Sequence, residues 1–329
     1  MSILGVKKTN IGEFFDGWYD GKFSANYAGY IESMQLEEVL DSIPLSIQDI
    51  LDHGCGQGSW IHLLQDKFLN AKITSIDISK NGIDVTKKLF PKHTFLFFDG
   101  ETAPLTDNSY DLIFSYHVLD AVWDLNKSLL DISRLLKKGG YLVIVVPCAN
   151  ENSFEEKITR LVKEGKEKSI DDYDRFFYSY SANVRIMKSN EIIELLLKYN
   201  FRVYKEFYSC QFWGAINEIS KSSFSFINEL FDYRRGVNIN AKIKLFLLRV
   251  IFVTIFCFVK LSSVRNVIIL DKVKMSENLI KKLTFFSFFL FKPISMIFGG
   301  ILSLFSFIEW KLRKNEKNGS GQYLVFKKL

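Results

Sequence analysis

From residue 49 onward the sequence alternates between short strand-like segments and longer segments with helical periodicity, and this alternation constrains the fold most strongly. Runs of Ile, Leu, Val and Phe end in Asp, Gly or Pro, and amphipathic segments follow them. Such alternation is typical of α/β domains with a mostly parallel sheet, because each helix carries the chain back for another strand. Strands are expected at residues 49–52, 72–77, 93–98, 110–115, 141–146, 201–208 and 322–326.

The helical segments and the gaps between them define the organisation of the chain. Helices are expected at residues 31–40, 81–89, 125–136 and 190–199, with Gly139-Gly140 ending the third of these. The polar and aromatic connection at 149–188 is too long for a simple loop. We therefore expect an N-terminal helical cap (1–48), an α/β core (49–210), a hydrophobic basic helical insert (211–319) and a final strand of the core (320–329).

The insert at 211–319 interrupts the α/β alternation with two long apolar stretches. Residues 245–261 are broken by Arg249 and Lys260, and residues 283–308 are broken by Lys292-Pro293, which we expect to split that stretch into two helices. Neither stretch is a clean span of about 20 apolar residues. The insert is therefore open to three interpretations: a membrane-embedded device, a buried helical subdomain or a dimer interface.

Charge is distributed unevenly along the chain and favours the first interpretation. Residues 1–233 carry a net charge of −8, whereas residues 234–329 carry +14 and are also rich in Phe. Basic charge beside apolar runs indicates an anionic membrane surface, contacted through residues 245–308, and not a nucleic acid. The basic linker between the two apolar stretches favours an in-plane or re-entrant arrangement over crossing helices.

The N-terminus and the cysteines indicate the compartment. The first residues lack the apolar run of a signal peptide, and the four cysteines are far apart with no CxxC pair. We expect a cytoplasmic protein that is peripheral or monotopic at the inner face of the cell membrane. No spacing of His, Cys, Asp or Glu predicts a metal site, and the oligomeric state cannot be predicted from the sequence.

A glycine-rich turn after the first strand carries the main chemical signal. It reads Asp52-His53-Gly54-Cys55-Gly56-Gln57-Gly58 and leads into a helix, whose free N–H groups and positive dipole end favour an anionic ligand group. Asp77 ends the second strand and is placed to accept both hydroxyls of a ribose. Asp99 and Gly100 end the third strand and are placed to bind the edge of an adenine. All of these residues follow carboxyl ends of strands, where open α/β sheets bind ligands.

At this point the chain resembles the class I S-adenosylmethionine-dependent methyltransferases, and most closely the methyltransferase type 11 domains. The segments that carry the resemblance are LDHGCGQG, SIDIS, FFDGETAPLTDNSYDLIFSYHVLDAVWD and ISRLLKKGGYLVIVVP. The resemblance covers about residues 49–210 and the final strand. It implies a Rossmann-like seven-stranded sheet with helices on both faces, whose last strand runs antiparallel beside the fifth.

The resemblance also implies the cofactor and its contacts. The cofactor is S-adenosyl-L-methionine. Asp52 corresponds to the acid near the methionine amino group, Ile78 to the residue against the adenine, and Ser115 and His117 to the exit of the fourth strand below the methyl donor. The full set of expected cofactor-binding residues is Asp52, Gly54, Gly56, Gly58, Asp77, Ile78, Asp99, Gly100 and Ser115.

Candidates for catalysis and for acceptor binding follow from side-chain chemistry. His117 is the one histidine well placed to take a proton from a hydroxyl acceptor, although an ordinary helix-start histidine is an equal alternative, and the chemistry of an activated sulfonium donor need not use a base. Where type 11 domains often show a Glu-His pair, this chain reads Asp120-Ala121. Tyr19, Tyr27 and Tyr178 are candidate contacts to the substrates.

The sequence therefore predicts a methyltransferase that moves a methyl group to an oxygen or carbon of a small acceptor. The apolar insert favours a lipid-linked or amphipathic acceptor at the membrane face, such as a glycan-lipid or a quinone-like molecule. The alternatives are a soluble methyltransferase of a sugar nucleotide or another small metabolite, with the insert as lid or dimer interface, and a donor-binding protein without catalysis. A nicotinamide-dependent oxidoreductase is disfavoured by the GxGxG spacing and by Asp99.

Overall fold

The computed structural model describes residues 15–16, 30–98, 102–162, 185, 187–222, 224–260 and 279–329, and these belong to two compact units. The first unit comprises Met1–Glu151, Tyr178–Ser209 and Asn315–Leu329, and the second comprises Asn152–Phe177 and Cys210–Lys314. Residues far apart in the sequence thus share each unit. The four-part division expected from the sequence stays a prediction.

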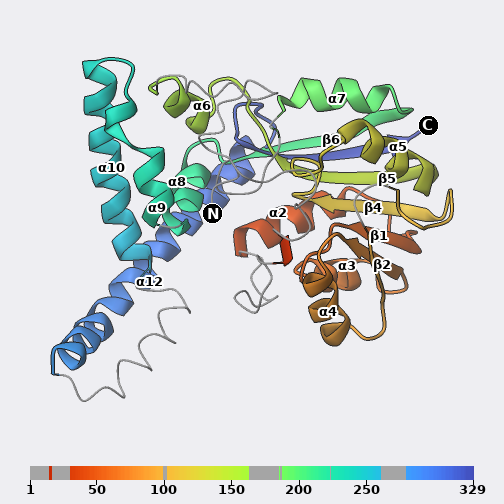
Figure 1. Cartoon of the computed structure of the whole chain (residues 1–329), viewed down its shortest axis with the longest axis horizontal. Helices are drawn as coiled ribbons and strands as arrows, with labels where there is room; N and C mark the ends of the chain where they lie inside the picture. The colour runs from red at the N-terminus through yellow and green to blue at the C-terminus, as the bar shows by residue number, and fades with distance from the viewer. Residues whose placement is uncertain are drawn as a thin grey trace. The chain divides into compact units, whose positions relative to one another are not determined.

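Within the described residues, the first unit contains a seven-stranded mixed sheet with the order β3-β2-β1-β4-β5-β7-β6 (Figure 1). All neighbouring strands are parallel except β7, which pairs antiparallel with both β5 and β6. This confirms the Rossmann-like sheet and the antiparallel last strand beside the fifth. The strands are β1 (Asp49–His53), β2 (Lys72–Asp77), β3 (Thr94–Phe97), β4 (Tyr110–Tyr116), β5 (Leu136–Pro147), β6 (Phe201–Ser209) and β7 (Gly321–Lys328).

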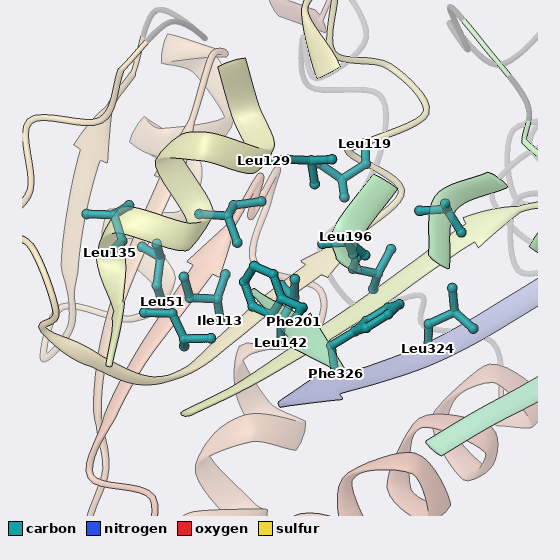
Figure 2. Packing of buried hydrophobic residues seen from close by; sticks show 14 of the residues in the cluster. Leu51, Ile113, Leu119, Leu129, Leu135, Leu142, Leu196, Phe201, Leu324 and Phe326 are labelled. Carbon is teal, nitrogen blue, oxygen red and sulfur yellow. The ribbon is translucent and has the colours of Figure 1, made fainter. Parts of the chain in front are cut away.

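Helices cover both faces of this sheet. The helices of the first unit are α2 (Tyr30–Asp41), α3 (Ile61–Lys67), α4 (Lys80–Leu89), α5 (Leu125–Leu135) and α7 (Ser189–Leu197). In Figure 1, α5 and α7 lie on one side of the sheet, and α3 and α4 lie on the other. Leu129 of α5 and Leu196 of α7 pack against Leu142, Leu324 and other side chains from the sheet, forming a continuous apolar core on that side (Figure 2).

Strand β7 comes from the end of the chain and fills the position between β5 and β6. Leu324, Val325 and Phe326 have no solvent exposure, as expected for a central strand. At its first residue, Gly321 pairs with Ser209, the last residue of β6. The chain therefore leaves the sheet at Ser209 and returns beside it at Gly321. Residues 210–320 form an insertion whose two ends are neighbours in the sheet.

The expectation that Gly139-Gly140 end the helix before β5 is wrong. Helix α5 ends at Leu135 and β5 begins at Leu136 with no intervening loop. Leu136 already pairs with Tyr110 of β4, and the pairing register shifts before Leu112. Gly139 has a φ of 79°, a left-handed conformation that glycine adopts without a Cβ clash. The glycines thus allow an irregularity inside the strand.

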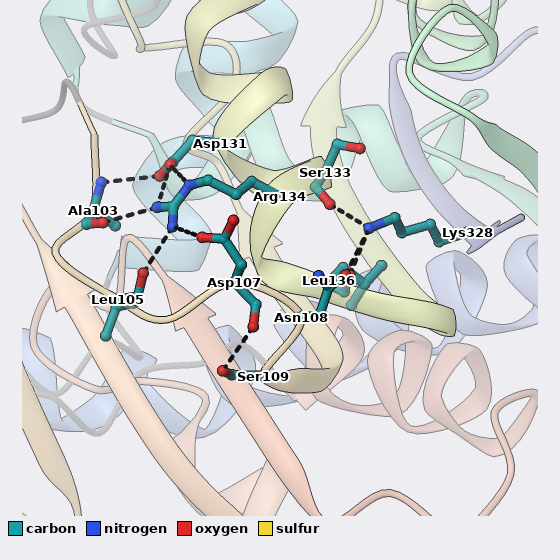
Figure 3. A network of polar contacts seen from close by, with 10 residues as sticks. All are labelled: Ala103, Leu105, Asp107, Asn108, Ser109, Asp131, Ser133, Arg134, Leu136 and Lys328. Carbon is teal, nitrogen blue, oxygen red and sulfur yellow. Dashed lines mark hydrogen bonds and ion pairs between the residues drawn. The ribbon is translucent and has the colours of Figure 1, made fainter.

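The end of α5 is held by a network of charged side chains (Figure 3). Arg134 donates to the carbonyl oxygens of Ala103 (2.9 Å) and Leu105 (2.7 Å), and to Oδ1 of Asp131. Lys328 of β7 donates to the carbonyl of Leu136 at 2.7 Å. The planar guanidinium suits several acceptors at once, and it fixes the loop before β4 to α5.

The second unit is helical in its described parts. Its elements are α6 (Phe154–Thr159), α8 (Trp213–Lys221), α9 (Phe224–Leu230), a 3₁₀ turn at Tyr233–Arg235, α10 (Ile239–Lys260) and α12 (Leu279–Arg313). The carboxylate of Glu309, which is 5% exposed, accepts the backbone N–H groups of Phe212, Trp213 and Gly214 at 2.8–3.0 Å. These three N–H groups lie at the start of α8 and have no acceptor within that helix. Glu309 of α12 therefore caps the N-terminus of α8.

The expectation that Lys292-Pro293 split the second apolar stretch is also wrong. Pro293 lies inside α12, which runs without interruption from Leu279 to Arg313. A proline removes one backbone hydrogen bond, and a long helix absorbs this loss when its other turns are stabilised. The contacts of Glu309 and the buried side chains of Leu302 and Trp310 supply such stabilisation in the later turns. No helix in the described parts of the chain is long and apolar enough to span a bilayer.

Candidate functional site

The candidate site lies at the carboxyl ends of β1 and β4, where the order of the sheet reverses. These two strands are neighbours, and His53 at the end of β1 pairs with Ser115 of β4. Strands β2 and β3 lie to one side of them and β5 to the other. At such a switch point the connections leave in opposite directions, and a crevice opens between them.

The glycine turn after β1 lies at this end of the sheet. Gly54, Gly56 and Gly58 have φ values of 79°, 53° and 77°, respectively. The N–H of Gly54 donates to the carbonyl of Ile76 in β2 at 2.8 Å. A Cβ atom added at Gly54 would lie 2.2 Å from Cγ2 of Val118, in the connection after β4. Only glycine fits this position, and the turn therefore packs closely between the ends of β2 and β4.

Asp77 at the end of β2 joins the glycine turn to the start of α4. Its carboxylate accepts the N–H of Gly56 at 2.8 Å and the N–H of Ser79 at 2.7 Å, and the residue is only 7% exposed. Burial raises the pKa of Asp77, and the two N–H donors oppose that rise. Ser79 is the N-cap of α4 and accepts the N–H of Gly82 at 3.0 Å. The N-cap of α4 is therefore Ser79 and not Asp77, which leaves donor binding as the prediction for Asp77.

Asp52 near the end of β1 is a second buried carboxyl group in the same place. It is 3% exposed. Burial, together with the nearby negative charge of Asp77, raises the pKa of Asp52 to about 7. Two buried carboxyl groups beside a turn of glycines suit a ligand that brings a positive charge and hydroxyl groups. The amino group and the ribose of S-adenosylmethionine have this chemistry, so the residues present fit that cofactor.

Of the remaining predicted contacts, the structure describes Ile78 and Ser115. Ile78 follows Asp77 and is half-buried. Ser115 is fully buried in β4, where its hydroxyl lies 3.3 Å from Nδ1 of His53. Burial lowers the pKa of His53 to about 4, so this imidazole is neutral. The predicted contacts Asp99, Gly100, Tyr19, Tyr27 and Tyr178 lie outside the residues that the structure describes.

His117 comes directly after β4 and faces the carboxylate of Asp120. Its backbone N–H donates to the carbonyl of Val145 in β5 at 2.8 Å, and its φ is 53°. The imidazole is 48% exposed, and its Nδ1 lies 3.7 Å from Oδ2 of Asp120, whose side chain is 2% exposed. An exposed imidazole that faces a buried carboxylate is the arrangement of a general base with a group that orients it.

One aromatic ring contacts this imidazole, and a second aromatic ring contacts the first. The rings of Tyr116 and His117 lie 4.7 Å apart between centroids, and the ring of Trp60 lies 4.7 Å from Tyr116. Trp60 precedes α3, so the end of β4 and the start of α3 together provide a largely apolar wall. Such a wall suits an acceptor with a flat or apolar part.

Three residues near the site were not found by sequence reasoning. In the sequence, Asp120 stands out only as a departure from the family pattern. Arg185 donates to the backbone carbonyls of Leu119 (3.2 Å), Val122 and Trp123 (2.8 Å), and so fixes the connection after β4. Asp16 accepts the hydroxyl of Ser79 at 2.7 Å and thus places part of the N-terminal segment beside Asp77. A charged residue distant in sequence gives no local signal for such contacts.

The fold and this site together define the class. The sheet order, the antiparallel β7, the glycine turn and the acids at the ends of β1 and β2 are those of the class I S-adenosylmethionine-dependent methyltransferases. Residues 51–144 match the model of the methyltransferase domain family. Over this segment the chain is similar to that family, and the cofactor is S-adenosylmethionine.

Known proteins resemble the chain over this part. A malonyl-acyl-carrier-protein O-methyltransferase of Buchnera aphidicola is 31% identical over 141 residues, 42% of this chain and 54% of that protein. A ubiquinone/menaquinone biosynthesis C-methyltransferase of Campylobacter jejuni is 31% identical over 101 residues, 29% of this chain and 43% of that protein. The matches thus span about half, or less, of the length of these relatives.

A solved structure shows the same fold over nearly the whole chain. The 4+2 cyclase SpnF superposes with a TM-score of 0.51 at 14% identity and covers 98% of this chain and 97% of its own. Its name describes a reaction other than methyl transfer. The fold therefore does not by itself decide the reaction, which depends on the residues of the site.

Replacing Asp77 tests the donor site. We expect Asp77→Asn to weaken binding of S-adenosylmethionine roughly 10- to 100-fold, because an amide accepts more weakly from Gly56 and from ribose hydroxyls than a carboxylate does. Titration calorimetry measures this. Asp84→Asn, an exposed position on the same α4, is the matched control and should bind as the wild type does. Equal donor affinity for Asp77→Asn and the wild type would contradict the assignment.

The pKa of Asp52 predicts how donor binding depends on pH. A carboxyl group with a pKa of about 7 is largely protonated at pH 5.5 and then cannot pair with the amino group of the donor. We expect donor affinity to rise roughly tenfold between about pH 5.5 and 7, a range in which that amino group stays protonated. In Asp52→Asn the rise should be much smaller. An equally steep pH dependence in this variant would assign the effect to another group.

Proposed function

We propose that the protein transfers a methyl group from S-adenosylmethionine to an oxygen or carbon atom of a small lipid-linked or amphipathic acceptor. The observation that carries this proposal is the convergence of Asp52, Asp77 and the exposed His117 on the carboxyl ends of three strands at the switch point of the sheet. Bound there, the cofactor supplies an activated methyl group. The protein then has to orient an acceptor toward that group and exclude water.

In this proposal, the nucleophilic atom of the acceptor attacks the methyl group of the donor. His117 accepts the proton that the acceptor loses. Nε2 of the imidazole takes the proton, and Asp120 at 3.7 Å from Nδ1 orients the ring and stabilises the imidazolium. Arg185, through its bonds to the carbonyls of Leu119 and Trp123, keeps the segment that carries His117 and Asp120 in place. Asp120 and Arg185 are thus positioning residues.

Two observations support an amphipathic acceptor. The wall of Trp60 and Tyr116 beside His117 is apolar and aromatic, as a quinone-like or lipid-linked acceptor requires. The relatives include both a malonyl-acyl-carrier-protein O-methyltransferase and a C-methyltransferase of ubiquinone/menaquinone biosynthesis, which supports an oxygen or a carbon as the acceptor atom. The glycan-lipid and quinone-like classes both meet these requirements.

Methyl transfer from a radiolabelled donor tests the proposal directly. The purified protein is incubated with labelled S-adenosylmethionine and either a lipid extract or the water-soluble metabolites of the cells that produce it. We expect label in the lipid extract, and much less label with Asp77→Asn at a limiting concentration of the donor. Label confined to the soluble fraction would replace the proposed acceptor with a sugar nucleotide or other metabolite. Tight donor binding without transfer to either fraction would indicate a protein without catalysis.

The role of His117 is tested by a substitution that preserves the backbone. Asparagine tolerates a positive φ better than most residues, so His117→Asn removes the base without straining the chain. We expect kcat to fall roughly 100-fold while donor affinity stays unchanged. The matched control is His62→Asn, at an exposed position on α3. An unchanged kcat in His117→Asn would show that alignment of the acceptor suffices.

A further inference from the structure

Helix α10 in the second unit carries large apolar side chains on an exposed face as well as on its buried face. Its inner face includes Leu245 and Phe252, which are buried against the rest of the unit, and Phe252 stacks on Phe231 at 4.6 Å between ring centroids. The outer face repeats at helical spacing, and its side chains are 49–69% exposed. These residues are Ile239, Ile243, Phe246, Leu247, Val250 and Ile251. A helix in water normally has polar residues on the outer face.

The last part of α12 repeats this pattern. Leu302 and Trp310 are buried on its inner face. On the outer face the apolar side chains again recur every three or four residues and are 41–64% exposed. These residues are Met296, Ile297, Ile301, Leu304 and Ile308. We refer to these two sets of outer residues as the outer faces of α10 and α12.

The two helices belong to one packed unit. The rings of Phe258 in α10 and Phe298 in α12 lie 5.8 Å apart between centroids, and α8 packs through Trp213 against Phe305 at 4.9 Å. The outer faces are therefore parts of a folded surface and not ends of loose segments. Together they expose more large apolar side chains than scattered surface residues explain, which marks an interaction surface.

Charge identifies the kind of partner that covers this surface. Residues 210–314 contain 16 Lys and Arg against 6 Asp and Glu. Lys242 and Lys244 are exposed in the first turns of α10, and Lys311 is exposed near the end of α12. A second copy of the chain would bring the same positive charge to the contact and be repelled. A nucleic acid would not cover the apolar residues. An anionic lipid surface satisfies both properties.

We propose that the outer faces of α10 and α12 insert into the interface of an anionic lipid bilayer while their inner faces stay packed in the protein. Apolar side chains enter the boundary between headgroups and acyl chains, and Lys242, Lys244 and Lys311 meet lipid phosphates. This rests on the proposed function in one respect, since it places the enzyme where a lipid-linked acceptor is found. The binding itself requires no methyl transfer.

Vesicle flotation with the full-length protein tests this proposal. Vesicles of phosphatidylcholine with phosphatidylglycerol are compared with vesicles of phosphatidylcholine alone. We expect the protein to float with the anionic vesicles, and binding to fall at least about tenfold in Phe246→Ser/Val250→Ser. Leu69→Ser, 82% exposed in the first unit, is the control for removing an exposed apolar side chain and should float as the wild type does.

A second pair of variants separates charge from apolar insertion. Lys242→Glu/Lys244→Glu should weaken binding to anionic vesicles and reduce its dependence on salt. Lys87→Glu/Lys88→Glu, at exposed positions on α4, makes the same change of charge in the first unit and should have no such effect. Wild-type protein that floats with neither kind of vesicle would overturn the proposal.

The same protein preparation also distinguishes lipid binding from a dimer contact, and the failure of this proposal from the failure of the proposed function. A stable dimer in lipid-free buffer that Phe246→Ser/Val250→Ser converts to a monomer would assign the surface to contact between copies and overturn the lipid proposal. Circular dichroism shows whether this variant is folded. Donor affinity, measured by calorimetry, should be unchanged in every surface variant. Vesicle binding without methyl transfer would leave the surface assigned and contradict only the proposed function.

Discussion

The antiparallel pairing of β7 between β5 and β6 is the constraint on which the rest of the structure depends. The strand is supplied by the last residues of the chain, and its side chains from Leu324 to Phe326 are fully buried in the centre of the sheet. The chain must therefore return to the sheet after Ser209, whatever it forms in between. The returning backbone passes very close to Ser209 at Gly319. Only glycine fits there, because a Cβ atom would lie 2.1 Å from the carbonyl oxygen of Ser209. A long apolar insert is compatible with a methyltransferase core only because both of its ends meet at one place in the sheet.

The candidate site is built from interactions that do not favour stability by themselves. Asp52 and Asp77 are two acids buried near each other, and burial raises the pKa of both. Backbone N–H groups of Gly56 and Ser79 compensate Asp77 in part. Such an arrangement is costly unless a ligand with complementary charge and hydroxyl groups binds there. His117 and Asp120 follow β4 at the same edge of the sheet, where the proposed donor and acceptor sites would meet.

Several features were predictable from the sequence because their signals are local. Glycines, acids and apolar periodicity mark the turn after β1, the ends of β2 and β4 and the helices between them. The family resemblance added the seven-stranded sheet with an antiparallel last strand beside the fifth. Gly139 and Pro293 were misinterpreted because each has two structural uses. Gly139 permits an irregular strand as well as a helix end, and Pro293 is tolerated inside a long helix whose other turns are well packed. The contacts of Arg185 and Asp16 bring together residues distant in the chain, for which a single sequence carries no pattern.

The sequence by itself determined the α/β class, the glycine turn, the acids at the ends of the strands and the asymmetry of charge, because each depends on residue type and spacing alone. Only the tertiary structure decided which side of α10 and α12 faces outward, that Glu309 caps α8, and that Asp120 lies beside His117. These properties depend on which elements pack together, and packing is decided by the whole set of buried surfaces at once. The same apolar stretch can be a core helix, a membrane-contacting helix or an interface, and the choice follows from what its other face is packed against.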